Sequence, residues 1–190
     1  MSSGQALSEE DHHNITLLLS SEQTYQQLLA LHMVDGGLYD ADIIKKISYD
    51  PELVLLCLKE SLENILQEFR FLYIRRFQLQ ALPLSTRHLQ NLIMLDLGYN
   101  QFIRIPLVIF ELTGLKKLRM AHNQIHHLTP QIRQLAGLEE LDLSFNILQD
   151  FPPEIMELKQ LKKLDISACS FSREKVRELH RTLPHTEIKF

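Results

Sequence analysis

The sequence predicts an α/β fold: a right-handed solenoid with a parallel sheet on its concave face, short helical returns on its convex face and a helical N-terminal cap. Two observations support this prediction. Residues 69–190 contain five apolar segments that recur every 23 residues, which is typical of repeat architectures with one shared core. Residues 1–68 show helix-capping signals instead. We therefore expect a helical segment over 1–68, five repeats over 69–171 and a C-terminal cap over 172–190.

Capping residues divide the N-terminal segment into helices. Ser8 and Asp11 form a possible capping box ahead of the apolar stretch Ile15–Leu19. Ser21 is expected to cap a second helix, which ends at Gly36-Gly37 because glycine tolerates the left-handed conformation there.

Two further aspartates predict the remaining helices of this segment. Asp40 is expected to start a short third helix, and Asp50-Pro51 is a good N-cap and first-position pair for a fourth. An apolar stripe then follows at helical spacing, at Leu58, Leu62, Ile65 and Phe69. These helices either shield the open edge of the first repeat or form an independent docking or dimerising bundle, and we favour the shield.

The repeat unit begins with an apolar-x-x-apolar-x-apolar segment. The five segments start at Phe69, Leu92, Leu115, Leu138 and Leu161. Within each, the last two apolar residues are two apart, as a strand requires to place both on one face. Three residues beyond each segment, where the alternation breaks and the chain must turn, stand Phe77, Asn100, Asn123, Asn146 and Cys169.

The asparagines and prolines explain the rest of the unit. An asparagine in the turn can bond its amide to backbone groups, so Asn100, Asn123 and Asn146 are expected to form a structural ladder. A later proline, as at Pro106 and Pro152, bars a ladder strand. The following Ile-x-x-Leu spacing suits a short helical or 3₁₀ return.

The central units, 92–114, 115–137 and 138–160, carry the specific pattern L-x-x-L-x-L-x-x-N-x-L-x-x-L-P-x-x-I-x-x-L at nearly every position. This pattern resembles that of the leucine-rich-repeat family, and the resemblance covers residues 69–190. It implies a non-catalytic scaffold that binds a protein or peptide on its concave face.

The C-terminal residues depart from the repeat and predict a cap. Ser172 is a suitable N-cap, Val176, Leu179 and Leu183 form one helix face, and Pro184 ends the helix. The tail 188–190 alternates as a short strand or a lid does. The Leu-Pro-x-x-x-Ile-x-Phe ending is similar to that of cytosolic bacterial leucine-rich-repeat proteins, and the cysteine-rich flanks of extracellular members are absent.

Composition and charge favour a cytoplasmic monomer. No apolar run is long enough to span a bilayer, and the N-terminus lacks the pattern of a secretory signal. Cys57 and Cys169 lie far apart without metal or redox spacing, so we expect two reduced thiols. Residues 1–68 hold 12 acidic and 3 basic side chains, whereas 69–190 hold 12 acidic and 17 basic. This difference in charge indicates either two differently solvated surfaces, which we favour, or an acidic segment that packs against the basic solenoid.

Catalysis, metal binding, cofactor binding and nucleic-acid binding are not expected. No phosphate-binding glycine loop, nucleophile elbow or metalloprotease motif is present. His122, His126 and His127 cluster in sequence, but no further ligand accompanies them. Basic residues recur on successive strands, yet acidic residues share the same sheet, whereas phosphate binding favours a single sign of charge.

The candidate binding residues are the strand and turn positions that should face the concave side. They are Tyr73, Arg75, Arg76, Met94, Asp96, Tyr99, Lys117, Arg119, His122, Glu140, Asp142, Phe145, Lys163 and Asp165. Two columns stand out within the sheet. The middle of the strands runs Tyr73, Asp96, Arg119, Asp142, Asp165, and the strand ends run Arg76, Tyr99, His122, Phe145, Ala168.

Aromatic residues mixed with arginine and alternating charge are the composition of a protein-binding patch. The plainer interpretation is that these charges satisfy one another, with Asp96 and Asp142 flanking Arg119 across neighbouring strands. The two readings are compatible, because exposed ion pairs are weak. The leading hypothesis is therefore a non-catalytic interaction module. The alternative is a regulatory or effector protein whose activity lies in residues 1–68, with the repeats as its targeting unit.

Overall fold

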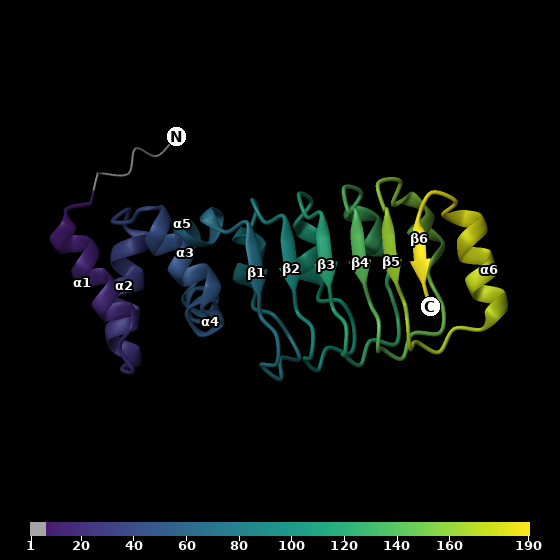
Figure 1. Cartoon of the computed structure of the whole chain (residues 1–190), viewed down its shortest axis with the longest axis horizontal. Helices are drawn as coiled ribbons and strands as arrows, with labels where there is room; N and C mark the ends of the chain where they lie inside the picture. Colours follow the sequence, from purple (N-terminus) through teal and green to yellow (C-terminus); the bar gives the residue numbers. More distant parts are fainter. Residues whose placement is uncertain (1–6) are drawn as a thin grey trace. The chain divides into compact units, whose positions relative to one another are not determined.

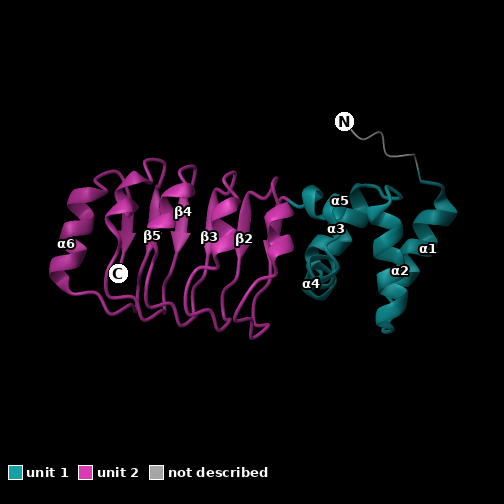
Figure 2. Cartoon of the chain, turned by 180° about the vertical axis from the view of Figure 1, so that it is seen from behind, with its two compact units in different colours: residues 1–69 teal, residues 70–190 magenta. Residues whose placement is uncertain are grey.

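The chain divides into two compact units, residues 1–69 and residues 70–190, and each is described by itself (Figures 1 and 2). The structure is a computed structural model that describes residues 7–190. Unit 1 is helical throughout its described part. Its helices are α1 Glu9–Leu19, α2 Thr24–Asp35, α3 Ala41–Tyr49, α4 Pro51–Glu60 and α5 Glu63–Glu68.

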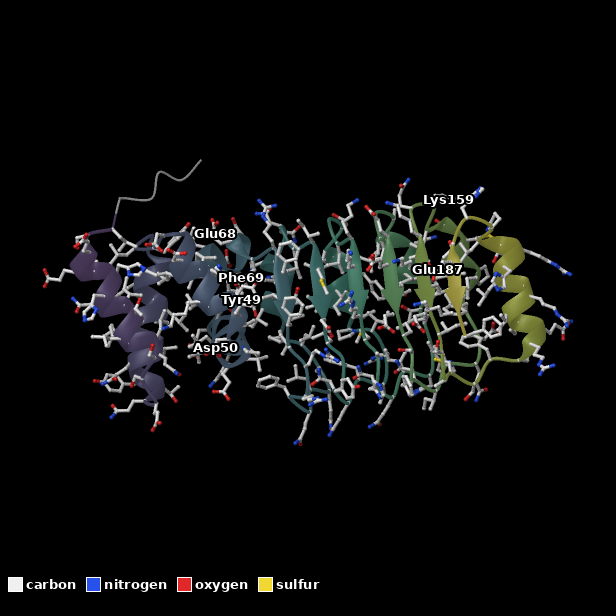
Figure 3. The ribbon with its side chains drawn as sticks, in the orientation of Figure 1. Tyr49, Asp50, Glu68, Phe69, Lys159 and Glu187 are labelled. Carbon is white, nitrogen blue, oxygen red and sulfur yellow. The ribbon has the colours of Figure 1, made fainter. Side chains whose placement is uncertain are left out.

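Side-chain caps start three of these helices where the sequence predicts them. The Ser8 hydroxyl accepts from the Asp11 N–H at 3.0 Å and begins α1. Asp40 accepts from two N–H groups of the first turn of α3, at 3.0 and 2.9 Å. Asp50, labelled in Figure 3, does the same for α4, with Pro51 in the first turn. Each cap satisfies N–H groups that have no partner within the helix.

The predicted cap of α2 was wrong. The helix begins at Thr24 after Gln23, which makes no side-chain cap bond. The Ser21 hydroxyl instead accepts from the Gln23 N–H at 3.0 Å, so it closes a turn ahead of the helix. The end of α2 falls at Gly36, as expected, and Gly37 takes a φ of +101°.

The fourth predicted helix is in fact two helices. Ser61 adopts a left-handed conformation with φ 56°, and the Leu62 N–H returns to the Cys57 carbonyl at 3.1 Å, which ends α4. The chain then turns into α5. The apolar stripe is nonetheless buried on both sides of the break, because Leu58, Leu62, Ile65 and Phe69 all lie in the interior.

Unit 2 is built on a six-stranded parallel sheet. The strands follow one another in chain order, from β1 to β6, and successive strands pair (Figure 1). They are β1 Phe71–Tyr73, β2 Met94–Asp96, β3 Lys117–Arg119, β4 Glu140–Asp142, β5 Lys163–Asp165 and β6 Glu187–Lys189. Leu72, Leu95, Leu118 and Leu141 pair in register and are buried, so the 23-residue period of the sequence becomes the strand register.

The returns between strands are 3₁₀ helices, as the Ile-x-x-Leu spacing predicts. Ile109, Ile132 and Ile155 are buried within three of them, so the returns close the core opposite the sheet. The four are η1 Leu84–His88, η2 Leu107–Glu111, η3 Pro130–Gln134 and η4 Pro153–Glu157.

A ladder of side-chain bonds links the turns of successive repeats. The Asn123 amide nitrogen donates to the carbonyls of Met120 at 3.0 Å and of Leu97, in the preceding repeat, at 3.1 Å. Its carbonyl oxygen accepts from the Phe102 N–H at 3.0 Å. Asn100 and Asn146 bond in the same way. At the final position the Cys169 thiol donates to the Leu143 carbonyl at 3.2 Å, so a weaker donor continues the ladder.

The last residues form a helix and a sixth strand. Helix α6, Arg173–Thr182, starts at Ser172, whose hydroxyl accepts from the Lys175 N–H at 3.2 Å. Val176, Leu179 and Leu183 are buried, as the helix-face prediction requires. The tail then pairs with β5 as the parallel strand β6, which carries Glu187 (Figure 3).

Candidate functional site

The residue before each ladder position turns the chain in a left-handed conformation. In the first four repeats the backbone N–H of this residue donates to the turn of the next repeat, as in Tyr99 to the Ala121 carbonyl at 2.9 Å and Phe145 to the Ser167 carbonyl at 2.8 Å. Consequently the side chains leave the backbone at equivalent points in every repeat. We name these five residues the turn column, and they are Arg76, Tyr99, His122, Phe145 and Ala168, with φ between 54° and 65°.

The side chains of the turn column stack on one another. The Tyr99 and His122 rings lie 4.1 Å apart at 13°, and the His122 and Phe145 rings lie 4.1 Å apart at 9°. The Arg76 guanidinium lies 4.8 Å from the Tyr99 ring centre, and that of Arg75 lies 5.1 Å from it. Tyr99 is 37% exposed and Phe145 52% exposed. The sequence-predicted column is therefore a continuous, accessible row of rings ending in guanidinium groups.

The aspartates predicted for the middle of the strands are the last residues of β2, β4 and β5, and they hold the turns. Asp96 accepts from the Gly98 N–H at 2.9 Å, and Asp142 accepts from the N–H and the hydroxyl of Ser144 at 3.0 and 2.7 Å. Asp165 accepts from the Ser167 N–H at 3.0 Å. These short carboxylates bond to the nearest backbone donor, two residues ahead.

Asp96 and Asp142 flank Arg119 in the strand register, as predicted, but among the described residues neither forms an ion pair with it. Arg119 lies 3.9 Å from Glu140, whose longer side chain reaches across the strand pair, and Asp96 lies 3.7 Å from the Arg75 Nε. Met94 and Asp96, both candidates from the sequence, are only 7% and 4% exposed, so they offer little surface to a partner. The Tyr73 hydroxyl lies against the Met94 sulfur at 3.7 Å.

Glu140 is the centre of a mixed-charge cluster on β3–β5. The Lys117 ammonium donates to it at 2.9 Å and, with Lys163 and Arg119, holds the pKa of this carboxyl below its usual range. A hollow of about 200 Å³ lies over β3–β6, and Glu140, Asp142, Lys163 and Asp165 are among the residues that line it. Five of the sequence candidates on β3–β5, these four and Arg119, therefore lie around one depression of the sheet.

A second row of alternating charges was not predicted from the sequence, and it consists of Lys116, Glu139 and Lys162. Glu139 lies between Lys162 at 2.6 Å and Lys116 at 3.9 Å. The hydrogen bond from Lys162 is the largest of the effects that lower the pKa of Glu139. The three residues occupy the same position in consecutive repeats with alternating sign, and this 23-residue spacing is the signal that could have found them.

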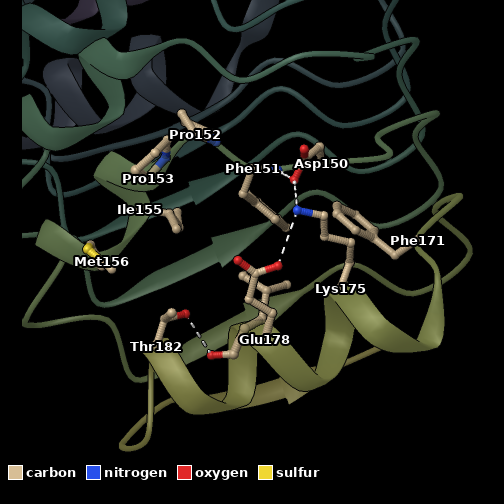
Figure 4. Close-up of a pocket in the computed structure, with 11 residues that line it drawn as sticks. Asp150, Phe151, Pro152, Pro153, Ile155, Met156, Phe171, Lys175, Glu178 and Thr182 are labelled. Carbon is tan, nitrogen blue, oxygen red and sulfur yellow. Dashed lines mark hydrogen bonds and ion pairs between the residues drawn. The ribbon is translucent and has the colours of Figure 1, made fainter.

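A pocket of about 280 Å³ lies between η4 and α6 (Figure 4). Phe151 and Phe171 stack in its wall, 4.9 Å apart. Lys175 lies 3.2 Å from both Asp150 and Glu178, and the pKa of Lys175 is raised by the hydrogen bonds to Glu178 and then Asp150. The contact between Lys175 and Asp150 joins α6 to the fourth repeat. Nothing in the sequence pattern pairs Phe151 with Phe171, since the two belong to different repeats and do not occupy equivalent positions.

The histidine cluster does not converge. His122 lies in the turn column, whereas His126 and His127 contact each other edge-on at 5.0 Å. Among residues 7–190, no group of histidine, cysteine, aspartate and glutamate side chains is placed to hold a metal ion.

Both cysteines are free thiols, and they should differ in reactivity. Burial raises the pKa of Cys57 to about 12, and burial also raises the pKa of the half-buried Cys169. Because the thiolate is the reactive form, we expect native Cys57 to resist a thiol reagent at neutral pH and Cys169 to react more slowly than a free cysteine. Raising the pH above neutral should accelerate the labelling of Cys169 but not that of Cys57. Timed labelling with mass spectrometry, against a Cys169→Ser control, measures both; rapid labelling of native Cys57 would contradict the buried thiol.

The chain is similar to known proteins in sequence and in fold. A family model described as "Leucine-rich repeat region" matches residues 56–186. A solved leucine-rich-repeat protein of Leptospira interrogans is 29% identical, with a TM-score of 0.64, over 68% of this chain and 33% of that one. An internalin of Listeria monocytogenes, InlF, is 20% identical, with a TM-score of 0.56, over 68% of this chain and 37% of that one.

The chain thus spans about a third of the length of these two solved structures. No curated protein matches it. None of the helices within residues 7–190 has the length and apolar character needed to cross a membrane.

Proposed function

Because the chain belongs to the leucine-rich-repeat family, we propose that it is a non-catalytic interaction module that binds a protein or peptide on its concave face. The observation that carries this proposal is the turn column. Its stacked rings are accessible, and a continuous aromatic row flanked by arginine is the composition of an interface anchor. The rings are already ordered by stacking, so a partner meets a surface with little side-chain freedom left to lose.

The charges around the column support the same face. Lys117, Glu140 and Arg119 form exposed or half-exposed ion pairs, which are worth about 0–1 kcal/mol and are easily exchanged for those of a partner. Six strands at about 4.8 Å span about 24 Å. A surface of this width fits a peptide-sized element, or a small protein that also contacts loops.

Capture of a partner from the lysate of the native host tests the proposal. We expect the double variant Tyr99→Ala with Arg119→Glu to lower recovery at least about tenfold, since removal of an interface anchor costs about 2 kcal/mol or more. Leu84→Ser, which changes an exposed residue of η1, is the matched control and should capture normally. Circular dichroism establishes that both variants fold. Unchanged capture by the folded double variant would contradict binding on the concave face.

Exposed apolar side chains on unit 1 favour a second candidate. Leu17 of α1, Tyr25 and Leu29 of α2 and Tyr49 of α3 are all more than half exposed. In this alternative, unit 1 carries a regulatory or effector contact and the repeats serve as its targeting unit. The variant Leu17→Ser with Tyr25→Ser, tested in the same capture experiment, separates the two, because it should affect recovery only if unit 1 binds.

The free thiols support a location in a reducing compartment, the cytoplasm. The Leptospira relative supports a bacterial origin. We propose in addition that the chain acts as a monomer, with unit 1 serving the repeats as their N-terminal cap.

A further inference from the structure

The turn column ends at an aromatic face that no other ring covers. His122 stacks on one face of Phe145, and the next residue of the column, Ala168, has no ring to cover the other face. Ala168 is exposed and takes the same left-handed turn as the others, with φ 55°. Within residues 7–190 no second ring stacks on Phe145. We name the space on the other face of Phe145, at the Ala168 position, the slot.

We infer that this slot receives an arginine side chain of the partner, whose guanidinium stacks on Phe145 above Ala168 and faces Asp142 and Asp165. The inference rests on the proposed function, and it specifies the chemistry of the partner at one end of the same surface.

The opposite end of the column already contains such a contact. Arg76 places its guanidinium 4.8 Å from the centre of the Tyr99 ring. The planar guanidinium stacks on a ring with little desolvation, whereas the compact, strongly hydrated ammonium of lysine does so less well. The ring spacing along the column is 4.1 Å, so a planar group in the vacant slot continues the stack at the same spacing.

Two carboxylates at the ends of β4 and β5 lack a cation. Asp142 and Asp165 pair in register on β4 and β5, three residues ahead of Phe145 and Ala168. Each uses Oδ1 to hold its own turn. Among the described side chains, no lysine or arginine nitrogen lies within 4.0 Å of either carboxylate. Both line the 200 Å³ hollow of the concave face.

The cations nearby do not fill this role. Lys117 and Arg119 contact Glu140, at 2.9 and 3.9 Å, and Lys163 acts on the pKa of that same carboxyl. Lys189 stands opposite Asp165 in the strand register, but the two form no ion pair in the part of the chain that is described. Two adjacent like charges on neighbouring strands are unfavourable. A cationic group with several donors, brought by the partner, relieves this repulsion.

The binding of small arginine probes to the full-length, isotope-labelled chain tests the inference by nuclear magnetic resonance. N-acetyl-arginine amide should give saturable shifts at Phe145 and Ala168. Its affinity should exceed that of the lysine and citrulline amides by about threefold to tenfold, because the contact combines stacking with charge. N-acetyl-tyrosine amide serves as the uncharged aromatic probe. Equal binding of the lysine, citrulline or tyrosine probe, or no saturable shift with arginine, would overturn the inference.

Two variants locate the site. Ala168→Tyr should fold, because Tyr99 occupies the same turn with φ 58°, and its own ring should fill the slot and abolish arginine binding. Phe145→Leu removes the stacking face and should weaken binding about threefold to tenfold. Ala168→Ser keeps the slot open and should bind as the unmodified chain does. Arginine binding that survives both Ala168→Tyr and Phe145→Leu contradicts the assignment.

A different result contradicts the proposed function itself: unchanged capture of the partner by the folded double variant Tyr99→Ala with Arg119→Glu. If that variant loses the partner while the arginine probe finds no site, the concave face binds its partner by other contacts. In that case the proposed function stands and the arginine inference is wrong.

Discussion

Asn123→Ala should lower the free energy of unfolding by about 3 kcal/mol, because it leaves several buried backbone groups without partners. The Asn123 side chain is buried in the turn of the central repeat. It accepts from Phe102 and donates to the carbonyls of Leu97, Met120 and, at 3.4 Å, Ala121. Alanine replaces none of these bonds, and water has little access to the groups that remain. Urea denaturation followed by circular dichroism measures the loss.

The neighbouring Gln124 is the matched control. Its side chain is exposed and makes no hydrogen bond within the described residues, so Gln124→Ala should change stability by less than about 0.5 kcal/mol. If the two variants proved equally stable, the ladder would contribute no more than a surface amide. Cys169, which occupies the same ladder position with a weaker donor, shows that the last repeat tolerates a poorer bond than we expect at the centre.

Leu118→Ala should destabilise the chain by about 2–5 kcal/mol and lower the melting temperature by about 10 °C. Leu118 lies at the centre of β3, fully buried, in register with Leu95 on one side and Leu141 on the other. Removal of its branched end leaves a cavity in the shared core that rigid neighbouring strands cannot close. Differential scanning calorimetry records the change.

Lys117, the residue before it on the same strand, provides the comparison. Lys117→Ala removes only a surface ion pair with Glu140, so the expected loss is at most about 1 kcal/mol. A Leu118→Ala variant that melts no lower than Lys117→Ala would show that the core relaxes around the cavity, against the continuous packing described above.

The repeat was predictable because residues 23 apart in the sequence are the residues that pair on neighbouring strands. The 23-residue spacing places Leu95, Leu118 and Leu141 side by side, and no other information is needed to pair β2, β3 and β4. The break at Ser61 was not predictable in this way. It carries no glycine, and a serine in the left-handed conformation is fixed by the return of the Leu62 N–H to Cys57, a contact that depends on the packing of the finished unit.

The candidate site was only partly readable for a similar reason. The positions of the turn column follow from the repeat, and the rings of Tyr99, His122 and Phe145 meet there. The partners of the charges depend on side-chain length instead. Glu140 is long enough to meet Arg119, whereas Asp142 bonds to the turn two residues ahead. The order of positive and negative residues in the sequence does not show which carboxylate pairs across strands and which bonds to its own turn.

The left-handed turn keeps the same backbone conformation whichever side chain it carries. Its five positions hold five different residue types (arginine, tyrosine, histidine, phenylalanine and alanine), and their φ angles agree within about 11°. The ladder and the buried leucines thus fix the backbone whatever side chain the turn presents. One residue per repeat can consequently be substituted without a change in the backbone. We therefore expect relatives of this chain to acquire new ligands by single substitutions at this position.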